Sequence, residues 1–311
     1  MTQERLSIAI GNSLKWVQGN IQYFDPIKKL LPEKQLHKMF SELQFFLSEL
    51  MKGQMFLNRE AQDILDELGS FSRRIILSPE YYEQLQLHPA KFRMYGMAAM
   101  YFLSYWKGED IQTIKDVICR TCNTAFSISP EMPPFRKMEY LYCICGIPDL
   151  LYGNADFDPS LIEEYAQRSI LCSGLDLANY SIHDEYAITH AVFYLTQMGK
   201  RKIIPDKYPN LKQCLLVLAI KNKYEEDLDL LGEYVIDLCI CGCHGNENLL
   251  TLIDFILNQQ RAEGCFSRPQ RNYISNTMGT NYGSQNMDCI DNYHTTLVCA
   301  MALTNYLRNA F

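Results

Sequence analysis

The chain has 311 residues, of which 48% are hydrophobic and 21% charged, the balance of a globular protein with a sizeable core. Its 36 acidic residues outnumber its 29 lysines and arginines, and the net charge of −7 leaves no excess cation to neutralise a phosphate backbone. The composition therefore excludes a disordered tail and argues against a nucleic-acid partner.

Apolar residues recur at three- and four-residue spacing along almost the whole chain, while strict alternation over a strand length is hard to find. The sequence therefore predicts an all-α protein. The expected helices lie near 3–22, 33–51, 58–75, 78–86, 89–106, 109–126, 134–146, 159–173, 183–198, 208–222, 225–242, 247–262 and 292–309.

Prolines and a glycine mark several of these helix boundaries. Ser78-Pro79 and Asp158-Pro159 each place a capping side chain before a proline at the first helical position. Gly199 follows an apolar run and is expected to terminate a helix.

About a dozen helices with short connections favour antiparallel neighbours, which leaves an (α/α) toroid or a curved helical solenoid. Segment 234–241 is apolar on nearly every side, whereas 160–170 has a clear polar face, as an inner and an outer layer would require. Segment 263–291, rich in Gly, Asn and Ser, is expected to be a long loop that is either functional or mobile.

We expect one all-helical domain over residues 1–311, with an N-terminal helical region 1–130 and a pocket-forming helical region 131–311. The N-terminus lacks the continuous apolar core of a secretory signal, and the longest apolar stretch, Tyr234–Cys243, is about half the length of a membrane span. These features predict a cytoplasmic protein without a membrane span. Its 12 cysteines are then expected to be free thiols.

Two candidate functional residues lie on the helix expected at 183–198. His190 interrupts an apolar run, and it is either a hydrogen-bonded core histidine or an acid or base at a site. Asp184 is near the helix start, where a carboxylate is favourable at the positive end of the dipole, so capping is the alternative to a role in chemistry.

Three ionisable groups share one face of the next apolar helix. Glu233, Asp237 and His244 align there with Cys241. Buried ionisable groups are costly unless they are partnered or line a wet cavity. The two carboxylates either bond to neighbouring helices or act chemically, by sharing a proton or binding a cation.

The last constellation is Asp291 and His294, one helical turn apart at the start of an apolar helix. A neighbouring carboxylate and imidazole suit an oriented general base or two metal ligands. A helix cap built from Asp291 is the alternative.

Segments 259–266 (QQRAEGCF) and 291–296 (DNYHTT) resemble the repeat turn and the histidine helix of the terpenoid-cyclase and protein-prenyltransferase toroids. The resemblance implies a double ring of helices around a cavity. It also implies zinc held by Asp, Cys and His, for which Asp288, Cys289 and His294 are the matching positions.

Two short segments, Cys145-Gly146 and Cys243-His244-Gly245, are similar to the zinc-binding segments of the lanthionine synthetase cyclases. This resemblance likewise implies a toroid with zinc in its centre.

Over most of its length the chain also resembles an uncharacterised family of bacterial proteins encoded near specialised-metabolite genes. The segments that carry this resemblance are 186–191 (YAITHA), 227–233 (DLDLLGE) and 292–295 (NYHT). It implies no established reaction, but it supports treating His190, Glu233 and His294 as one set.

Together these patterns predict an enzyme of bacterial specialised metabolism that modifies a natural product or peptide in a central pocket. The histidines would act as acid–base groups or metal ligands, with the carboxylates orienting them or sharing protons. The candidate catalytic residues are His190, His294, Glu233, Asp237, Asp184 and Asp291. The expected partner is a small-molecule or peptide substrate. The alternative is a non-catalytic helical scaffold that binds a peptide or protein in a concave groove.

Overall fold

The computed structural model describes residues 2–28, 30, 33–87, 89–106, 131–142, 160–172, 179–203, 207–267 and 284–311. All regular elements in these ranges are helices, which confirms the all-α prediction. The α-helices are α1 (Gln3–Gly19), α2 (Glu33–Lys52), α3 (Arg59–Ile76), α4 (Pro79–Leu87), α5 (Pro89–Tyr105), α7 (Pro134–Leu141), α9 (Ser160–Gln167), α10 (Ile182–Leu195), α11 (Leu211–Tyr224), α12 (Leu228–Ile240), α13 (Glu247–Asn258) and α14 (Ser284–Ala310). Short 3-10 helices occupy Ile21–Phe24, Gln54–Phe56 and Ile170–Cys172.

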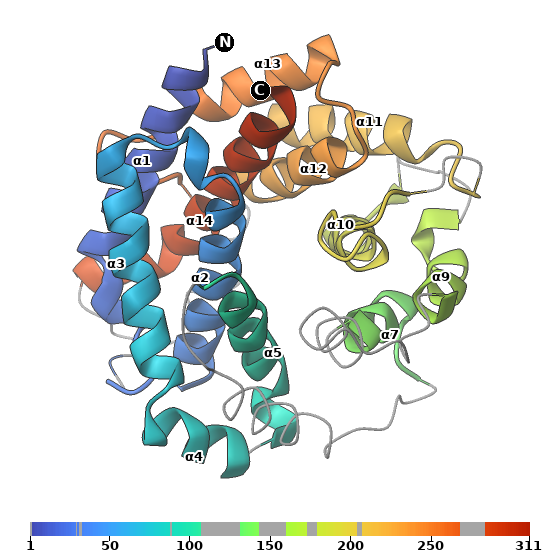
Figure 1. Cartoon of the computed structure of the whole chain (residues 1–311). Helices are drawn as coiled ribbons and strands as arrows, with labels where there is room; N and C mark the ends of the chain where they lie inside the picture. Colours follow the sequence, from blue (N-terminus) through green and yellow to red (C-terminus); the bar gives the residue numbers. More distant parts are fainter. Residues whose placement is uncertain are drawn as a thin grey trace.

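The helices alternate between an inner ring and an outer layer (Figure 1). Among the inner helices, α7 packs against α10, α10 against α12, α12 against α14, α14 against α2, and α2 against α5. The outer helices α1, α3, α4, α9, α11 and α13 pack on their outer sides. Because α14 packs against α2, the two ends of the chain meet, and the arrangement fits the predicted (α/α) toroid or curved solenoid.

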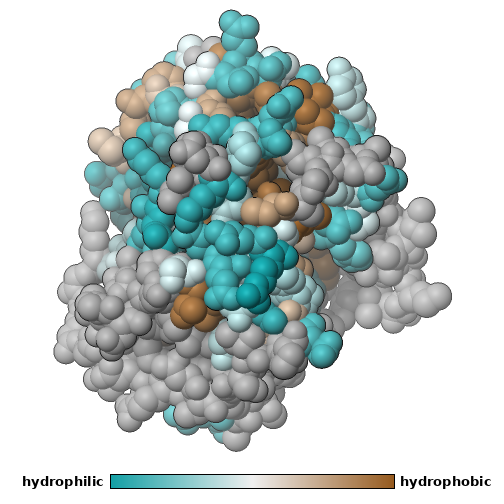
Figure 2. Space-filling view, turned by 90° about the vertical axis from the view of Figure 1, so that its right-hand side faces the viewer, coloured by the Kyte–Doolittle hydropathy of each residue, from teal (hydrophilic) through white to brown (hydrophobic). Residues whose placement is uncertain are grey.

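Inner and outer helices differ in burial as their sequences indicate. Every residue of α12 from Leu228 to Cys239 is buried, whereas α3 is strongly amphipathic and buries one side only. Gly232 lets α12 approach α14 closely, since a Cβ there would lie 2.7 Å from Cγ1 of Val298. On the face shown in Figure 2, the described surface is mostly hydrophilic and its hydrophobic residues form smaller patches between the hydrophilic ones.

Most predicted helix boundaries agree with the structure. Pro79 is the first residue of α4, and Gly199, with φ +84°, lies in the turn that follows α10. Gln197 and Met198 also have positive φ values in this turn, so the chain reverses over three consecutive left-handed residues. The helix predicted at 109–126 lies outside the described residues.

The start of α14 was predicted wrongly. This helix begins at Ser284 rather than near residue 292, so the last part of the loop expected at 263–291 is helical. Polar residues at this end satisfy one another along the helix: Nδ2 of Asn292 donates to the backbone oxygen of Asp288 and to its Oδ1. The polar composition of this segment predicted a loop, but these hydrogen bonds are compatible with a helical backbone, and the prediction was wrong for this reason.

No helix in the described part of the chain is long and apolar enough to cross a membrane. The eight cysteines within the described ranges are all free thiols, as expected. Most of them are buried in the helical core.

Candidate functional site

Four consecutive inner helices bring ionisable and hydroxyl side chains into contact. We call this group the ring site. It consists of Glu42 on α2, Tyr186 and His190 on α10, Asp229 and Glu233 on α12, and His294 on α14. The contacts run from helix to helix around the ring and involve none of the outer helices.

His294 lies between two carboxylates. Its Nδ1 is hydrogen-bonded to Oε2 of Glu42 at 3.1 Å, and its Nε2 is 3.2 Å from Oδ1 of Asp229. Burial lowers the pKa of His294, but the charges of Asp229 and Glu42 outweigh it and raise the pKa to about 9. For the Glu42 carboxyl, burial acts in the opposite direction and would raise the pKa. The charges of His294 and Lys38 outweigh burial there and lower the pKa to about 2.

Asp229 accepts a hydrogen bond through only one of its oxygens in the described structure. Tyr186 donates its hydroxyl to Oδ2 at 2.6 Å. Oδ1 is buried and makes no hydrogen bond within the described ranges, although Nε2 of His294 is close. The contact of Oδ1 within the site is therefore the ion pair with His294, without a hydrogen bond.

Glu233 lies one turn further along α12. Its Oε2 accepts a hydrogen bond from the Thr189 hydroxyl, and Nδ1 of His190 is 3.6 Å from the same oxygen. Burial and the charge of Asp229 raise the pKa of the Glu233 carboxyl, while His190 acts in the opposite direction. The carboxylate is 6% exposed and the His190 side chain 30%, so the histidine is the member of this pair that solvent reaches.

Aromatic rings surround His190 on its own helix. The rings of Tyr186, Phe193 and Tyr194 lie with centroids 5.9–6.2 Å from the imidazole. All three are partly exposed, as is His190 itself. A molecule that reached His190 would therefore meet aromatic surface.

Three members of the ring site have the arrangement of metal ligands. Asp229, Glu233 and His294 each offer one atom, and these atoms lie within 4.8 Å of one another. No other group of three such residues comes together in the part of the chain that the structure describes.

The structure places the other candidate residues outside this group. Asp237 is fully buried one turn beyond Glu233, and neither of its oxygens has a hydrogen bond within the described ranges. Burial, and then the charge of Glu233, raise its pKa well above the ordinary value. Asp184 completes a capping box with Ser181 at the start of α10, and Asp291 is partly buried on α14.

The zinc ligands implied by the resemblances do not converge either. Asp288 is exposed and accepts hydrogen bonds from Asn292 and Arg261, while Cys289 is buried. Cys243 and His244 lie in the turn after α12, and Cys145 is outside the described residues. Only His294 from these sets belongs to the ring site.

Sequence reasoning missed Glu42, Asp229 and Tyr186. Asp229 and Tyr186 each lie four residues before a recognised candidate, Glu233 and His190, so helical spacing could have indicated them. Glu42 has no comparable local signal, because it is 252 residues from His294 in sequence.

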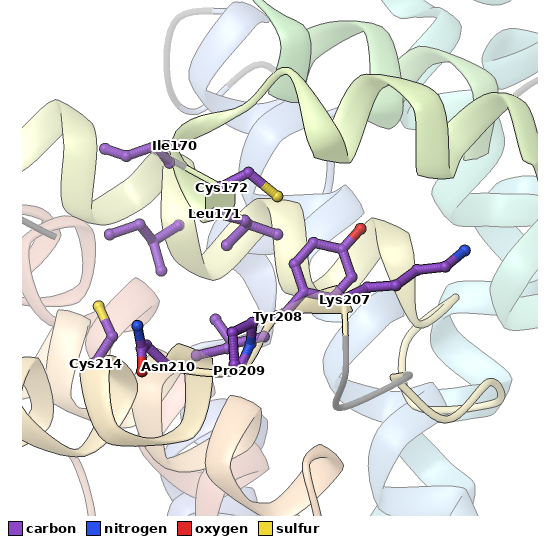
Figure 3. Close-up of a pocket in the computed structure, with 10 residues that line it drawn as sticks. Ile170, Leu171, Cys172, Lys207, Tyr208, Pro209, Asn210 and Cys214 are labelled. Atoms are coloured by element: carbon purple, nitrogen blue, oxygen red, sulfur yellow. The ribbon is translucent and has the colours of Figure 1, made fainter. Parts of the chain in front are cut away.

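A separate pocket of about 220 Å³ lies between Ile170–Cys172 and the start of α11 (Figure 3). Apolar side chains such as Leu171 and Ile188 line much of it, together with Tyr208 and Cys172. No member of the ring site lines this pocket, so the two are distinct places on the molecule.

Fold and site together define a ring-shaped, all-α protein with carboxylates and histidines converging from its inner helices. The chain belongs to the family described as a domain of unknown function, DUF6895, whose model matches residues 10–304. No curated protein and no solved structure matches the chain significantly. The functional argument therefore depends on the geometry of the ring site.

Proposed function

We propose that the protein is an enzyme that modifies a small molecule or a peptide at the ring site. The observation that carries the proposal is the convergence of two histidines and three carboxylates from four inner helices, drawn from positions up to 252 residues apart. Clusters of ionisable groups with mutually shifted pKa values are typical of catalytic sites.

The state of the individual groups supports catalysis over a structural role. A buried carboxylate that only stabilises a fold is expected to have all its oxygens bonded. Oδ1 of Asp229 has no hydrogen bond in the described structure, and both histidine side chains are 30% exposed. Both imidazole side chains are thus partly exposed, while Asp229 and Glu233 are buried and Glu42 is partly exposed.

His190 is the proposed proton donor or acceptor, and Glu233 orients it. Their separation of 3.6 Å is long for a hydrogen bond, but such contacts often tighten only when substrate binds. The aromatic rings beside His190 favour a substrate with an apolar or aromatic portion at the reacting position. His294, fixed by Glu42 and Asp229, supplies charge or binds a metal next to it.

The proposed setting is bacterial specialised metabolism, in the cytoplasm. Its support is that the three segments resembling proteins encoded near such genes, 186–191, 227–233 and 292–295, contain five of the six ring-site residues. The substrate would then be a natural product or a precursor peptide.

The test compares metabolite changes produced by the wild-type chain and by His190→Ala. Purified protein is incubated with small-molecule and peptide extracts of the source organism, and all masses are compared before and after. Loss of an acid–base group should slow the conversion about 10²- to 10⁴-fold. The matched control is His183→Ala, which changes an exposed histidine on the same helix and should leave the conversion intact. If the wild-type chain converts nothing, or if His190→Ala converts equally fast, the protein is not the proposed enzyme.

A further inference from the structure

We propose that Asp229, Glu233 and His294 bind one divalent transition-metal ion, with zinc and manganese as the best-suited ions. The inference rests on the proposed function for its catalytic meaning, since it states which chemistry the ring site supplies. Its geometric basis is independent of any substrate.

The spacing of the three groups is compatible with ligands of one metal ion. Two ligands, each about 2.0–2.2 Å from a tetrahedral ion, are about 3.3–3.6 Å apart. Nε2 of His294 and Oδ1 of Asp229 are 3.2 Å apart, yet Oδ1 is not in hydrogen-bond geometry with any described group. The third ligand atom lies within 4.8 Å of both, which requires only a small side-chain movement.

Oδ1 of Asp229 is an independent indication of a cation site, because it is buried and has an ion-pair contact with Nε2 of His294 but no hydrogen bond among the described residues. Asp229 is 5% exposed, so water compensates little for the hydrogen bond that Oδ1 lacks. A bound divalent ion would coordinate Oδ1 directly and replace its contact with the protonated imidazole.

Each proposed ligand also makes a hydrogen bond to a second residue, as metal ligands usually do. Glu42 is bonded to Nδ1 of His294, which leaves Nε2 for the metal. Tyr186 holds Oδ2 of Asp229, and Thr189 holds Oε2 of Glu233, so each carboxylate keeps its other oxygen for the ion. Such supporting bonds fix the orientation of the ligands before the metal arrives.

The ligand types select the kind of ion. One imidazole nitrogen with two carboxylate oxygens suits zinc or manganese, whereas magnesium and calcium prefer oxygen alone and copper(I) prefers sulfur. Two ligating carboxylates balance the charge of a divalent ion. Binding requires His294 to release the proton on Nε2, so one proton leaves the site for each ion bound there.

Three protein ligands leave at least one position on the ion for water or substrate, as in catalytic rather than structural sites. His190 lies beside the ligand Glu233, where it can exchange a proton with a molecule bound at that open position. The metal and the proposed proton-transfer residue would thus act on the same substrate.

The test is metal binding by the full chain after treatment with a chelator. Calorimetric titration with Zn²⁺ and with Mn²⁺, combined with elemental analysis, should give one tightly bound ion per chain for at least one metal. His294→Ala and Asp229→Asn should weaken binding at least about 100-fold. Tyr186→Phe, which keeps all three ligands and nearly the same volume, should weaken it about 10- to 100-fold and covers the case in which a ligand variant misfolds.

His244→Ala is the matched control, because it removes an exposed histidine that follows α12 and should not affect affinity. Substoichiometric binding, or binding that Tyr186→Phe and His294→Ala leave unchanged, would overturn the metal site. Conversion of metabolites by chelator-treated protein would then still support the proposed enzyme. Tight binding without any conversion would instead support the metal site and remove the enzyme.

Discussion

Two clusters on the same pair of helices, α10 and α12, show how a structural carboxylate differs from a reactive one. Glu185 is 1% exposed, and it receives hydrogen bonds from Lys221, from Asn222 at 2.5 Å and from Tyr234 at 3.4 Å. We call these four residues the Glu185 cluster. Its neighbour in sequence, Tyr186, belongs to the ring site, where one carboxylate oxygen has no hydrogen bond in the described structure.

The two clusters differ in how many hydrogen-bond and charge partners their carboxylates have. The Glu185 cluster offers one carboxylate a cation and two further donors, so it ties α10 to α11 and α12 without leaving a reactive atom. The ring site brings three carboxylates together with Lys38 and two histidines, and its histidines reach solvent. Burial alone therefore does not separate the two clusters, whereas the partners of their carboxylates do.

The same substitution in both clusters should give the largest contrast. Glu185→Gln replaces one acceptor oxygen by an amide donor that faces three other donors. It also removes the closer of the two charge partners of Lys221, the other being Glu225, so we expect a loss of about 3 kcal/mol in the free energy of unfolding. Glu233→Gln keeps an acceptor for Thr189, and we expect a change of less than about 1 kcal/mol or a gain. Urea denaturation of the metal-free proteins measures both. Equal losses would mean that the ring site is as structural as the Glu185 cluster.

Asp237 should show a smaller effect that depends on pH. Its pKa is raised in the folded state, so the folded chain holds a proton that the unfolded chain releases once the pH exceeds the ordinary carboxyl value. The wild-type chain then loses stability from this group as the pH rises through the folded-state pKa. Asp237→Asn has no such proton, and its stability relative to wild type should increase between pH 4 and pH 8. A difference that is constant across this range in denaturant titrations would contradict the burial of an unpaired carboxyl group.

The thiol of Cys214 offers the mildest probe of the Glu185 cluster. Burial, and then the charge of Glu185, raise its pKa to about 11, so roughly one thiol in a thousand is ionised at pH 8. Alkylation followed by mass spectrometry should modify the exposed Cys172 much faster than Cys214 in the native chain. Glu185→Gln should speed the reaction of Cys214 by loosening the packing around it. An unchanged rate would show that the cluster contributes little to local rigidity.

The sequence predicted the helical class, the inner and outer layers, and the three helices that carry His190, Glu233 and His294. Each of these features leaves a local signal, either in the spacing of apolar residues or as a polar residue within an apolar helix. The resemblance to the uncharacterised family already groups His190, Glu233 and His294 as one set. Glu42 has no such signal, because its partner is distant in sequence. Asp184 could not be separated from a helix cap by spacing alone, and the structure shows it in a capping box.

The contact between α2 and α14 also has a consequence for how the protein is made. A ribosome adds about 5–20 residues per second, so the 252 residues between Glu42 and His294 take roughly 10 to 50 s to synthesise. Glu42 leaves the ribosome first, and Asp229 and Glu233 follow much later, but all three precede the imidazole of His294. The ring site is therefore assembled only when α14 emerges, and the contacts of His294 with Glu42 and Asp229 form only at that stage of synthesis.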